Sequence, residues 1–311
     1  MKLGRKRNES ETPFLESGEG AIANKEVEGL SQGQIVLRRF LRHKAALVSL
    51  FFLISIIVLV FSAVDSRLGP IRTNGWWKWG TDDLPELRFG DCPNDTIGCP
   101  TLSVVPKFLG GEGIKLGEHP FGQDDIGRDY FALVMKGTQR SLSVMVIIGA
   151  IGATLGIIVG SIAGFYGKMV DAVLMRLVDF IQTVPTIIIA AVIGKAAGKV
   201  GPLYLALFLG ILGWTGLARL VRAQFLSLRE MEFVDAARVA GASNIRIAFK
   251  HILPNAVGQI IVAVTLIMAG AILTETALSY LGFGVVAPDV SLGLLISQYE
   301  SSFTTRPWLF W

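Results

Sequence analysis

His119 and the acidic residues after it are the first side chains in this sequence that could bind a metal ion. Asp124, Asp125 and Asp129 follow closely, and histidine together with carboxylates is a common set of metal ligands. The histidine stands alone, however, and Pro120 follows it directly, which is typical of a turn. We therefore predict no metal site in this chain.

Two Gly-Lys pairs, at 167–168 and 198–199, could indicate phosphate binding. A phosphate-binding P-loop needs an earlier glycine and a Ser or Thr after the lysine. Ile162 and Ile193 occupy the place of that glycine, and neither lysine is followed by Ser or Thr. The sequence also has no zinc-protease His-Glu pair and no nucleophile elbow. We expect no ATP hydrolysis by this chain alone, and an intramembrane enzyme is the weaker hypothesis.

The sequence as a whole is strongly apolar. Of 311 residues, 51% are hydrophobic and 17% are charged, and the mean hydropathy is +0.54. These values are too apolar for a soluble domain of this size. The net charge of +4 does not indicate a nucleic-acid partner. The composition predicts an all-α integral membrane protein.

Long charge-poor segments predict membrane-spanning helices at 45–64, 141–166, 177–197, 203–218 and from 252 or 257 to 280. Basic residues before the first segment predict a cytoplasmic N-terminus, and Pro185 should bend the third. The organisation predicted is a disordered cytoplasmic tail (1–33), an interfacial amphipathic helix (34–44), a first span (45–64), an extracytoplasmic cap (65–139) and a transmembrane core (140–311) with a cytoplasmic loop at 221–254.

A glycine stripe marks the second span, at Gly152, Gly156, Gly160 and Gly164. Glycine at every fourth residue leaves one face of a helix bare, so that another helix can approach closely. The alternative is that the bare face lines a pathway with room for cargo. We favour helix packing.

The most polar interior segment predicts a helix, a turn and a second helix. Strong helix formers occupy 226–240, Gly241 stands where a left-handed C-cap is needed, and Ser243 can cap the next helix. Pro254 should start a new element. Small residues around the turn would let another surface approach the backbone.

This segment resembles the cytoplasmic loop of the membrane permeases of ABC importers. Those loops carry Glu-Ala-Ala, three residues, Gly, and later Leu-Pro, and here Asp replaces the Glu. The resemblance implies that the loop inserts into a groove of an ATP-binding subunit. The implied ATPase-coupling residues are Asp235, Ala236, Ala237, Gly241, Ala242, Ser243, Leu253 and Pro254.

The end of the outer segment resembles a signature of the dipeptide, oligopeptide and nickel branch of these permeases. Family members have six spans, so 307–311 looks like the start of a sixth helix that this sequence does not contain. The signature residues are His119, Pro120, Gly122, Asp124, Gly127, Arg128 and Asp129.

The two cysteines, Cys92 and Cys99, lie seven residues apart in this same outer segment. An oxidising compartment favours a disulfide, and we predict a local one between them. The alternative is two free thiols in a reducing setting.

Glu275 interrupts the otherwise charge-free fifth span. A carboxylate near the end of a span is costly to leave facing lipid, so we predict that it faces the translocation pathway or a subunit seam. If the cargo is a peptide, its amino terminus is the natural partner. The alternatives are that the carboxylate reaches outer water or bonds to a neighbouring helix.

The resemblance implies a multi-pass permease subunit of a binding-protein-dependent ABC importer in the inner membrane, carrying dipeptides or oligopeptides. Its partners would be a homologous permease, two ATP-binding subunits and an extracytoplasmic binding protein, besides membrane lipid. No cofactor is expected in this chain, and ATP and Mg would bind the partner subunits. Nickel or another small solute is the alternative cargo. A proton-coupled secondary transporter is the alternative class, for which the sequence shows neither mid-membrane ionisable residues nor repeats.

Overall fold

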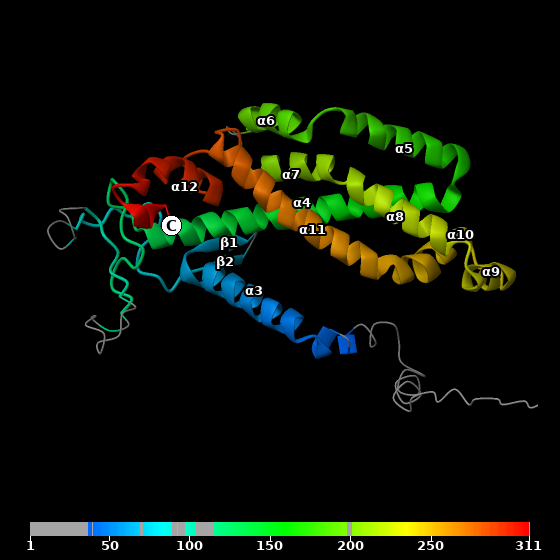
Figure 1. Ribbon diagram of the computed structural model, residues 1–311, viewed down its shortest axis with the longest axis horizontal. Coiled ribbons are helices and arrows are strands. Elements are labelled where there is room, and N and C mark those ends of the chain that lie inside the picture. The colour runs from blue at the N-terminus through cyan, green and yellow to red at the C-terminus, as the bar shows by residue number, and fades with distance from the viewer. Residues whose placement is uncertain are drawn as a thin grey trace, which may run out of the picture. The chain divides into compact units, whose positions relative to one another are not determined.

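A computed structural model describes residues 37–38, 40–68, 71–88, 92, 97–103, 113, 115–197 and 201–310. The expected tail at 1–33 and any helix after Trp311 lie outside the described residues. The chain divides into two compact units, Met1–Val58 and Leu59–Trp311, which are considered separately. The described part is mostly helical (Figure 1).

The helix α3 (Lys44–Ala63) matches the first expected span. Its 20 residues are long enough to cross the hydrocarbon core of a bilayer. Residues 37–38 and 40–42 are also helical and stop at His43, whose Nδ1 accepts a hydrogen bond from Ala46 N at 3.1 Å. His43 therefore separates the basic leading segment from α3.

The segment after α3 forms a small hairpin of β1 (Ser66–Leu68) and β2 (Ile71–Thr73), paired antiparallel with Ser66 opposite Thr73. These strands are a minor addition to an otherwise helical fold. The expected outer segment, 65–139, ends earlier than predicted, because α4 (Tyr130–Tyr166) already begins at Tyr130. Its first six residues, 130–135, are apolar, but Lys136, Gln139 and Arg140 follow, so the charge-free run that hydropathy detects starts only at 141.

The long helix α4 is central to the second unit and runs alongside α7 (Pro202–Gly213), α8 (Thr215–Leu228) and α11 (Leu253–Tyr280) (Figure 1). The glycine stripe explains this close approach. A Cβ added at Gly156 would lie 2.8 Å from the Leu217 side chain, and one at Gly160 would lie 2.5 Å from the Ala218 carbonyl oxygen. The stripe is therefore a helix-packing surface within this chain, as we favoured.

The third expected span is broken, as Pro185 predicted. The helices α5 (Lys168–Thr183) and α6 (Thr186–Ala197) meet at a 68° bend, because proline lacks an N–H and disfavours helix in the residue before it. The start of this span, set at 177, was wrong. The helix begins at Lys168, so residues 168–176 are helical as well.

The polar segment differs from the expectation at both ends. The helix expected at 226–240 is broken, because α8 runs to Leu228 and α9 (Glu232–Val239) starts after a short turn. Pro254 is the second residue of α11, next to where it was expected to start an element, but α10 (Asn244–Arg246), the π-helical η3 (Ile247–Ile252) and α11 form one continuous helical run. The π turn sits directly before the proline, where the N–H is missing.

In the described part, four helices are long and apolar enough to cross a membrane, or five if the bent pair α5 and α6 is one span. The segment after α11 forms α12 (Leu292–Tyr299) and two 3-10 turns, η4 (Glu300–Phe303) and η5 (Pro307–Leu309). Of these, α12 packs on α11 and α4.

Candidate functional site: an exposed elbow and a capped outer loop

The elbow, defined here as residues 232–243, consists of α9 and the turn after it. The turn is a Schellman motif, in which Ala242 N donates to Ala237 O at 3.0 Å and Gly241 N donates to Arg238 O at 2.9 Å. Gly241 has φ +79°, which glycine adopts without strain. Ser243 then caps the next helix, because its hydroxyl accepts a hydrogen bond from Arg246 N at 3.4 Å. The expected roles of Gly241 and Ser243 agree with this geometry.

The apolar face of the elbow is buried against the rest of the unit. Val234 and Ala237 are buried in a cluster that includes Phe225 of α8 and Ile247 and Ile252 of η3. The elbow is therefore packed against the ends of two long helices. Ala237, expected to present a small side chain to a partner, was placed wrongly, because it faces this core.

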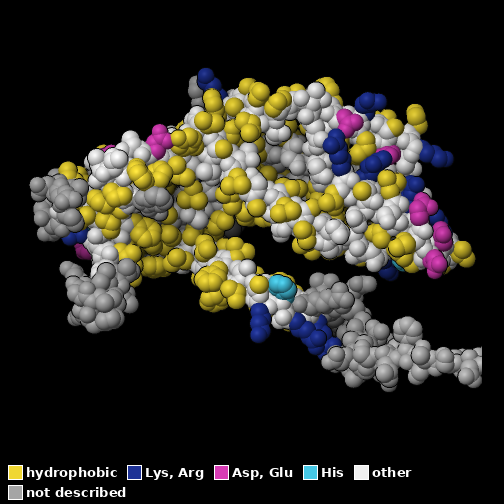
Figure 2. Space-filling view, viewed as in Figure 1, with side chains coloured by type: hydrophobic (Ala, Val, Ile, Leu, Met, Phe, Trp, Pro, Cys, Tyr) yellow, Lys and Arg dark blue, Asp and Glu magenta, His cyan; other side chains and the backbone are white. Residues whose placement is uncertain are grey.

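The opposite face of the elbow is exposed and partly apolar. Val239 is 91% exposed, and Ile245 and Phe249 just beyond the turn are 68% and 56% exposed. Asp235 is also exposed and pairs with Arg238 of its own helix at 3.0 Å. Figure 2 shows acidic, basic and apolar side chains gathered at this end of the unit. Of the other expected coupling residues, Ala236 and Gly241 are exposed here, while Leu253 and Pro254 lie in α11, beyond η3.

Three arginines of α8 and its C-cap hold the neighbouring inner segments, and the sequence analysis did not identify them. Arg222 binds both carboxylate oxygens of Asp171 in α5, and Arg229 donates to Gly164 O at 3.2 Å. Arg219 pairs with Asp179 at 2.5 Å. The sequence does show two acidic and three basic residues at the ends of apolar segments. It does not show which acid pairs with which base.

The outer signature loop is a rigid cap on the N-terminus of α4. Asp129 is its N-cap, with Oδ2 accepting from Ala132 N at 2.9 Å and from Trp77 Nε1 at 2.8 Å. His119 Nδ1 lies 2.9 Å from Asp129 Oδ1. A carboxylate at a helix N-terminus is stabilised by free N–H groups and the helix dipole. This arrangement explains His119 without a metal, and the described residues contain no grouping of three or more potential metal-binding side chains.

The middle of this loop is organised by Asp124. Its Oδ1 accepts from Ile126 N at 3.0 Å and Arg128 N at 2.8 Å, and its Oδ2 accepts from Arg128 Nε at 2.6 Å. Tyr299 of α12 donates its hydroxyl to Asp124 Oδ2 at 3.0 Å, and burial raises the pKa of that phenol, which keeps it protonated. Gly122 and Gly127 have φ of +82° and +94°, so both glycines are needed for the turn.

Two residues that hold this loop in place, Gln123 and Tyr299, were not predicted from the sequence. Gln123 is fully buried, and its side chain donates to Glu86 O at 3.0 Å and accepts from Arg88 N at 3.1 Å. Tyr299 is the second. Their bonds span 35 to 37 and 175 residues of chain, and no local pattern indicates such pairs.

Glu275 lies inside the unit and not on an open surface, which corrects the expected position on a pathway or seam. The side chain is fully buried. Its two carboxylate oxygens accept hydrogen bonds from Ser141 of α4 at 2.8 Å and from Ser279 at 2.7 Å. Bonding to a neighbouring helix was the alternative considered, and it satisfies the carboxylate without lipid or water.

Cys92 and Cys99 are joined by a disulfide with 5.6 Å between their Cα atoms. That separation is within the ordinary range for such bonds. The Gly98 carbonyl oxygen accepts from Gln123 N at 2.8 Å, so the disulfide ties its loop to the signature loop.

These features define an integral membrane protein with apolar helices, a signature loop that caps α4 and an exposed elbow built on the ends of two helices. Residues 156–306 match the family model of the binding-protein-dependent transport system inner membrane component, and residues 31–64 match that of the N-terminal TM domain of oligopeptide transport permease C. The chain belongs to this family of membrane permeases.

The similar proteins include the oligopeptide transport system permease protein OppC of Mycobacterium tuberculosis, 35% identical over 91% of this chain and 87% of that protein. The dipeptide transport system permease protein DppC of Lactococcus lactis is 31% identical over 89% of this chain and 82% of that protein. Among solved structures, the MetNI methionine ABC transporter matches 57% of this chain and 84% of its own chain, with 20% identity and a TM-score of 0.46.

Proposed function

We propose that this chain is one of two permease subunits of an ATP-driven importer of dipeptides and oligopeptides, and that the elbow couples it to the ATPases. The observation that carries the proposal is the exposed elbow, whose apolar Val239 is 91% exposed. Exposed apolar side chains grouped on a rigid element are typical of a protein interface. The names of the OppC and DppC relatives support peptides as cargo.

The partners follow from this assignment. A homologous permease would complete the pathway, two ATP-binding subunits would hold ATP and Mg, and an extracytoplasmic protein would deliver cargo. This chain would catalyse no reaction itself. Basic residues before α3, among them Arg42 and Lys44, support a cytoplasmic N-terminus.

The elbow can transmit force because its inner face is packed. Val234 contacts the same buried cluster as Phe225 of α8 and Ile260 of α11, and close-packed interiors resist compression. Movement of α9 by an ATPase would therefore displace the inner ends of α8 and α11 together. The glycine stripe locks α8 to α4, so the displacement continues into the longest helix of the unit.

The test is ATP-dependent uptake of a radiolabelled tripeptide by proteoliposomes that contain the complete complex. Val239→Lys should lower uptake at least about tenfold, because burying an unpaired ammonium in an interface costs more than 1.4 kcal/mol. The matched control is Leu116→Lys, which makes the same change at a 57% exposed position in the outer segment and should leave uptake unchanged. Absence of tripeptide uptake by the parent complex, with another solute transported, would overturn peptides as cargo.

A further inference from the structure

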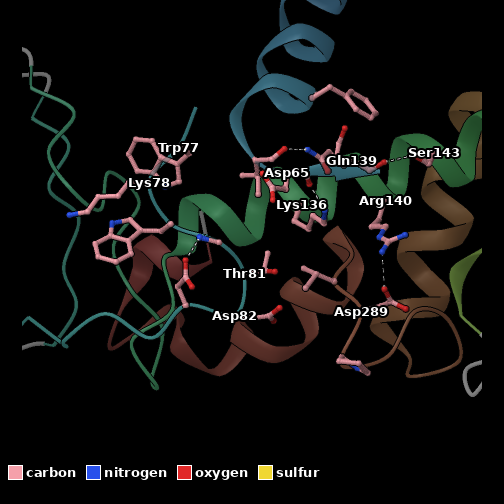
Figure 3. Close-up of a pocket in the computed structure, with 18 residues that line it drawn as sticks. Asp65, Trp77, Lys78, Thr81, Asp82, Lys136, Gln139, Arg140, Ser143 and Asp289 are labelled. Atoms are coloured by element: carbon pink, nitrogen blue, oxygen red, sulfur yellow. Dashed lines mark hydrogen bonds and ion pairs between the residues drawn. The ribbon is translucent and has the colours of Figure 1, made fainter. Parts of the chain in front are cut away.

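A cavity of about 680 Å³ lies beside the first turns of α4, between the end of α3, residues 77–83 and residues 288–290 (Figure 3). Its volume falls within the range of about 300–1,000 Å³ that is typical of small-molecule sites. All of its lining residues belong to the second unit. Neither the elbow nor the family signature accounts for it.

The cavity has charged walls of opposite character. Figure 3 shows Lys136 and Arg140 extending from α4, while Asp82 comes from the coil segment across from them. Arg140 pairs with Asp289 at 3.3 Å, and Lys136 donates to the Asp65 carbonyl oxygen at 2.5 Å. The α4 wall therefore carries two cations held in place by their own contacts, and one of them, Arg140, is paired with Asp289, which also lines the cavity.

The coil wall is acidic and its charge is not compensated. Asp82 is exposed and has no hydrogen bond or ion pair among the described residues. Asp83 accepts only from Gly80 N, at 2.7 Å, which fixes the turn without neutralising the carboxylate. The nearest lysine of the segment, Lys78, is engaged elsewhere, since it pairs with Glu118 at 3.4 Å and lies 4.4 Å from the Trp79 ring.

The walls are rigid because the signature loop holds them. Trp77 is bonded to the N-cap Asp129, and Trp79 stacks on His119 with ring centroids 5.4 Å apart. A site with fixed walls loses less conformational entropy when a ligand binds than a flexible one would.

We propose that this cavity binds the amino-terminal end of a short peptide on its way into the transporter, with the peptide ammonium at Asp82. This inference rests on the proposed function. The acidic coil wall attracts the ammonium group, and the basic α4 wall repels it and favours the carboxylate end. The ligand is therefore oriented by two opposed charges, as a zwitterionic peptide requires and a simple cation does not.

The experiment uses the complete complex and a tripeptide that carries a photoreactive benzophenone on its central side chain. After irradiation, mass spectrometry locates the label. The free-amine peptide should label residues 77–83 or 136–143, and Asp82→Asn should lower this labelling about tenfold, the usual effect of removing one charge-assisted contact. The matched control, Glu86→Gln, removes an exposed carboxylate of the same outer segment outside the cavity and should have no effect.

The amino-acetylated tripeptide supplies the second comparison. It should label the cavity weakly in the parent protein and equally weakly in Asp82→Asn. Label found only outside the cavity, or equal labelling in the Asp82 and Glu86 variants, overturns the inference. Uptake of the tripeptide is measured on the same preparation: uptake without label in the cavity rejects this site alone, whereas no ATP-dependent uptake rejects the proposed function as well.

Discussion

Replacing Gly160 by alanine tests the packing of α4 on α8 most sharply. The added Cβ would lie 2.5 Å from the Ala218 carbonyl oxygen and 2.7 Å from Val221 Cβ. Both distances are short of van der Waals contact, so the helices would have to separate by roughly 1 Å. Overpacking of this kind costs about 1–3 kcal/mol, and the better helix propensity of alanine returns about 1 kcal/mol. We expect a net loss of up to about 2 kcal/mol.

The matched control lies on the same stripe. A Cβ at Gly152 would have no neighbour closer than 3.9 Å, so Gly152→Ala should be neutral or slightly stabilising. The assay is the thermal stability of the purified complex, followed by size-exclusion after heating. Gly160→Ala should lower the midpoint by about 2–12 °C relative to Gly152→Ala, because both variants gain helix propensity and only Gly160→Ala has the overpacking cost of about 1–3 kcal/mol, at roughly 2–4 °C for each kcal/mol. Equal midpoints, or a higher one for Gly160→Ala, would refute the packing argument.

Three further results are expected. Gly241→Val should force a β-branched residue into positive φ, at a local strain cost of about 1–2 kcal/mol, and Asp235→Lys should reverse the exposed charge of the elbow. Complexes with either variant should assemble with the second permease but lose stimulated ATP hydrolysis. Parent-like stimulation in both variants would contradict coupling through the elbow. Alkylation of Cys92 and Cys99 without reductant should add no mass, and two modified thiols would show that the disulfide is absent. Glu275→Gln should change uptake by less than about twofold because an acceptor is kept, and loss of uptake with normal assembly would return Glu275 to the pathway.

Sequence predicted the parts of the fold that depend on local or compositional signals. The apolar run of α3 and the break at Pro185 are read directly from residue types, and the turn at Gly241 follows from one glycine at the end of a helix-forming segment. Helix ends were harder. Tyr130 starts α4 because Asp129 caps it, but Lys136 and Arg140 interrupt the apolar sequence of its first turns, so hydropathy placed the start at 141.

The rest of the site depends on contacts between distant segments. Tyr299 reaches Asp124 across 175 residues, and Ser141 reaches Glu275 across 134. The sequence shows that exposing the Glu275 carboxylate to lipid would cost free energy. It does not show which neighbouring residue donates a hydrogen bond to this carboxylate. The burial of Ala237 was missed for the same reason, because a small residue suits an exposed interface and a packed core equally well.

Cross-linking from the elbow in the assembled complex tests the central claim most directly. A cysteine placed at Val239, which is 91% exposed, is treated with a short bifunctional thiol reagent; the native cysteines are joined to each other and should not react. The account predicts a cross-link to an ATP-binding subunit, whose yield changes when ATP is added. Leu116→Cys, in the outer segment, should give none. A Val239→Cys complex that transports peptide but forms no cross-link to an ATP-binding subunit would contradict the account.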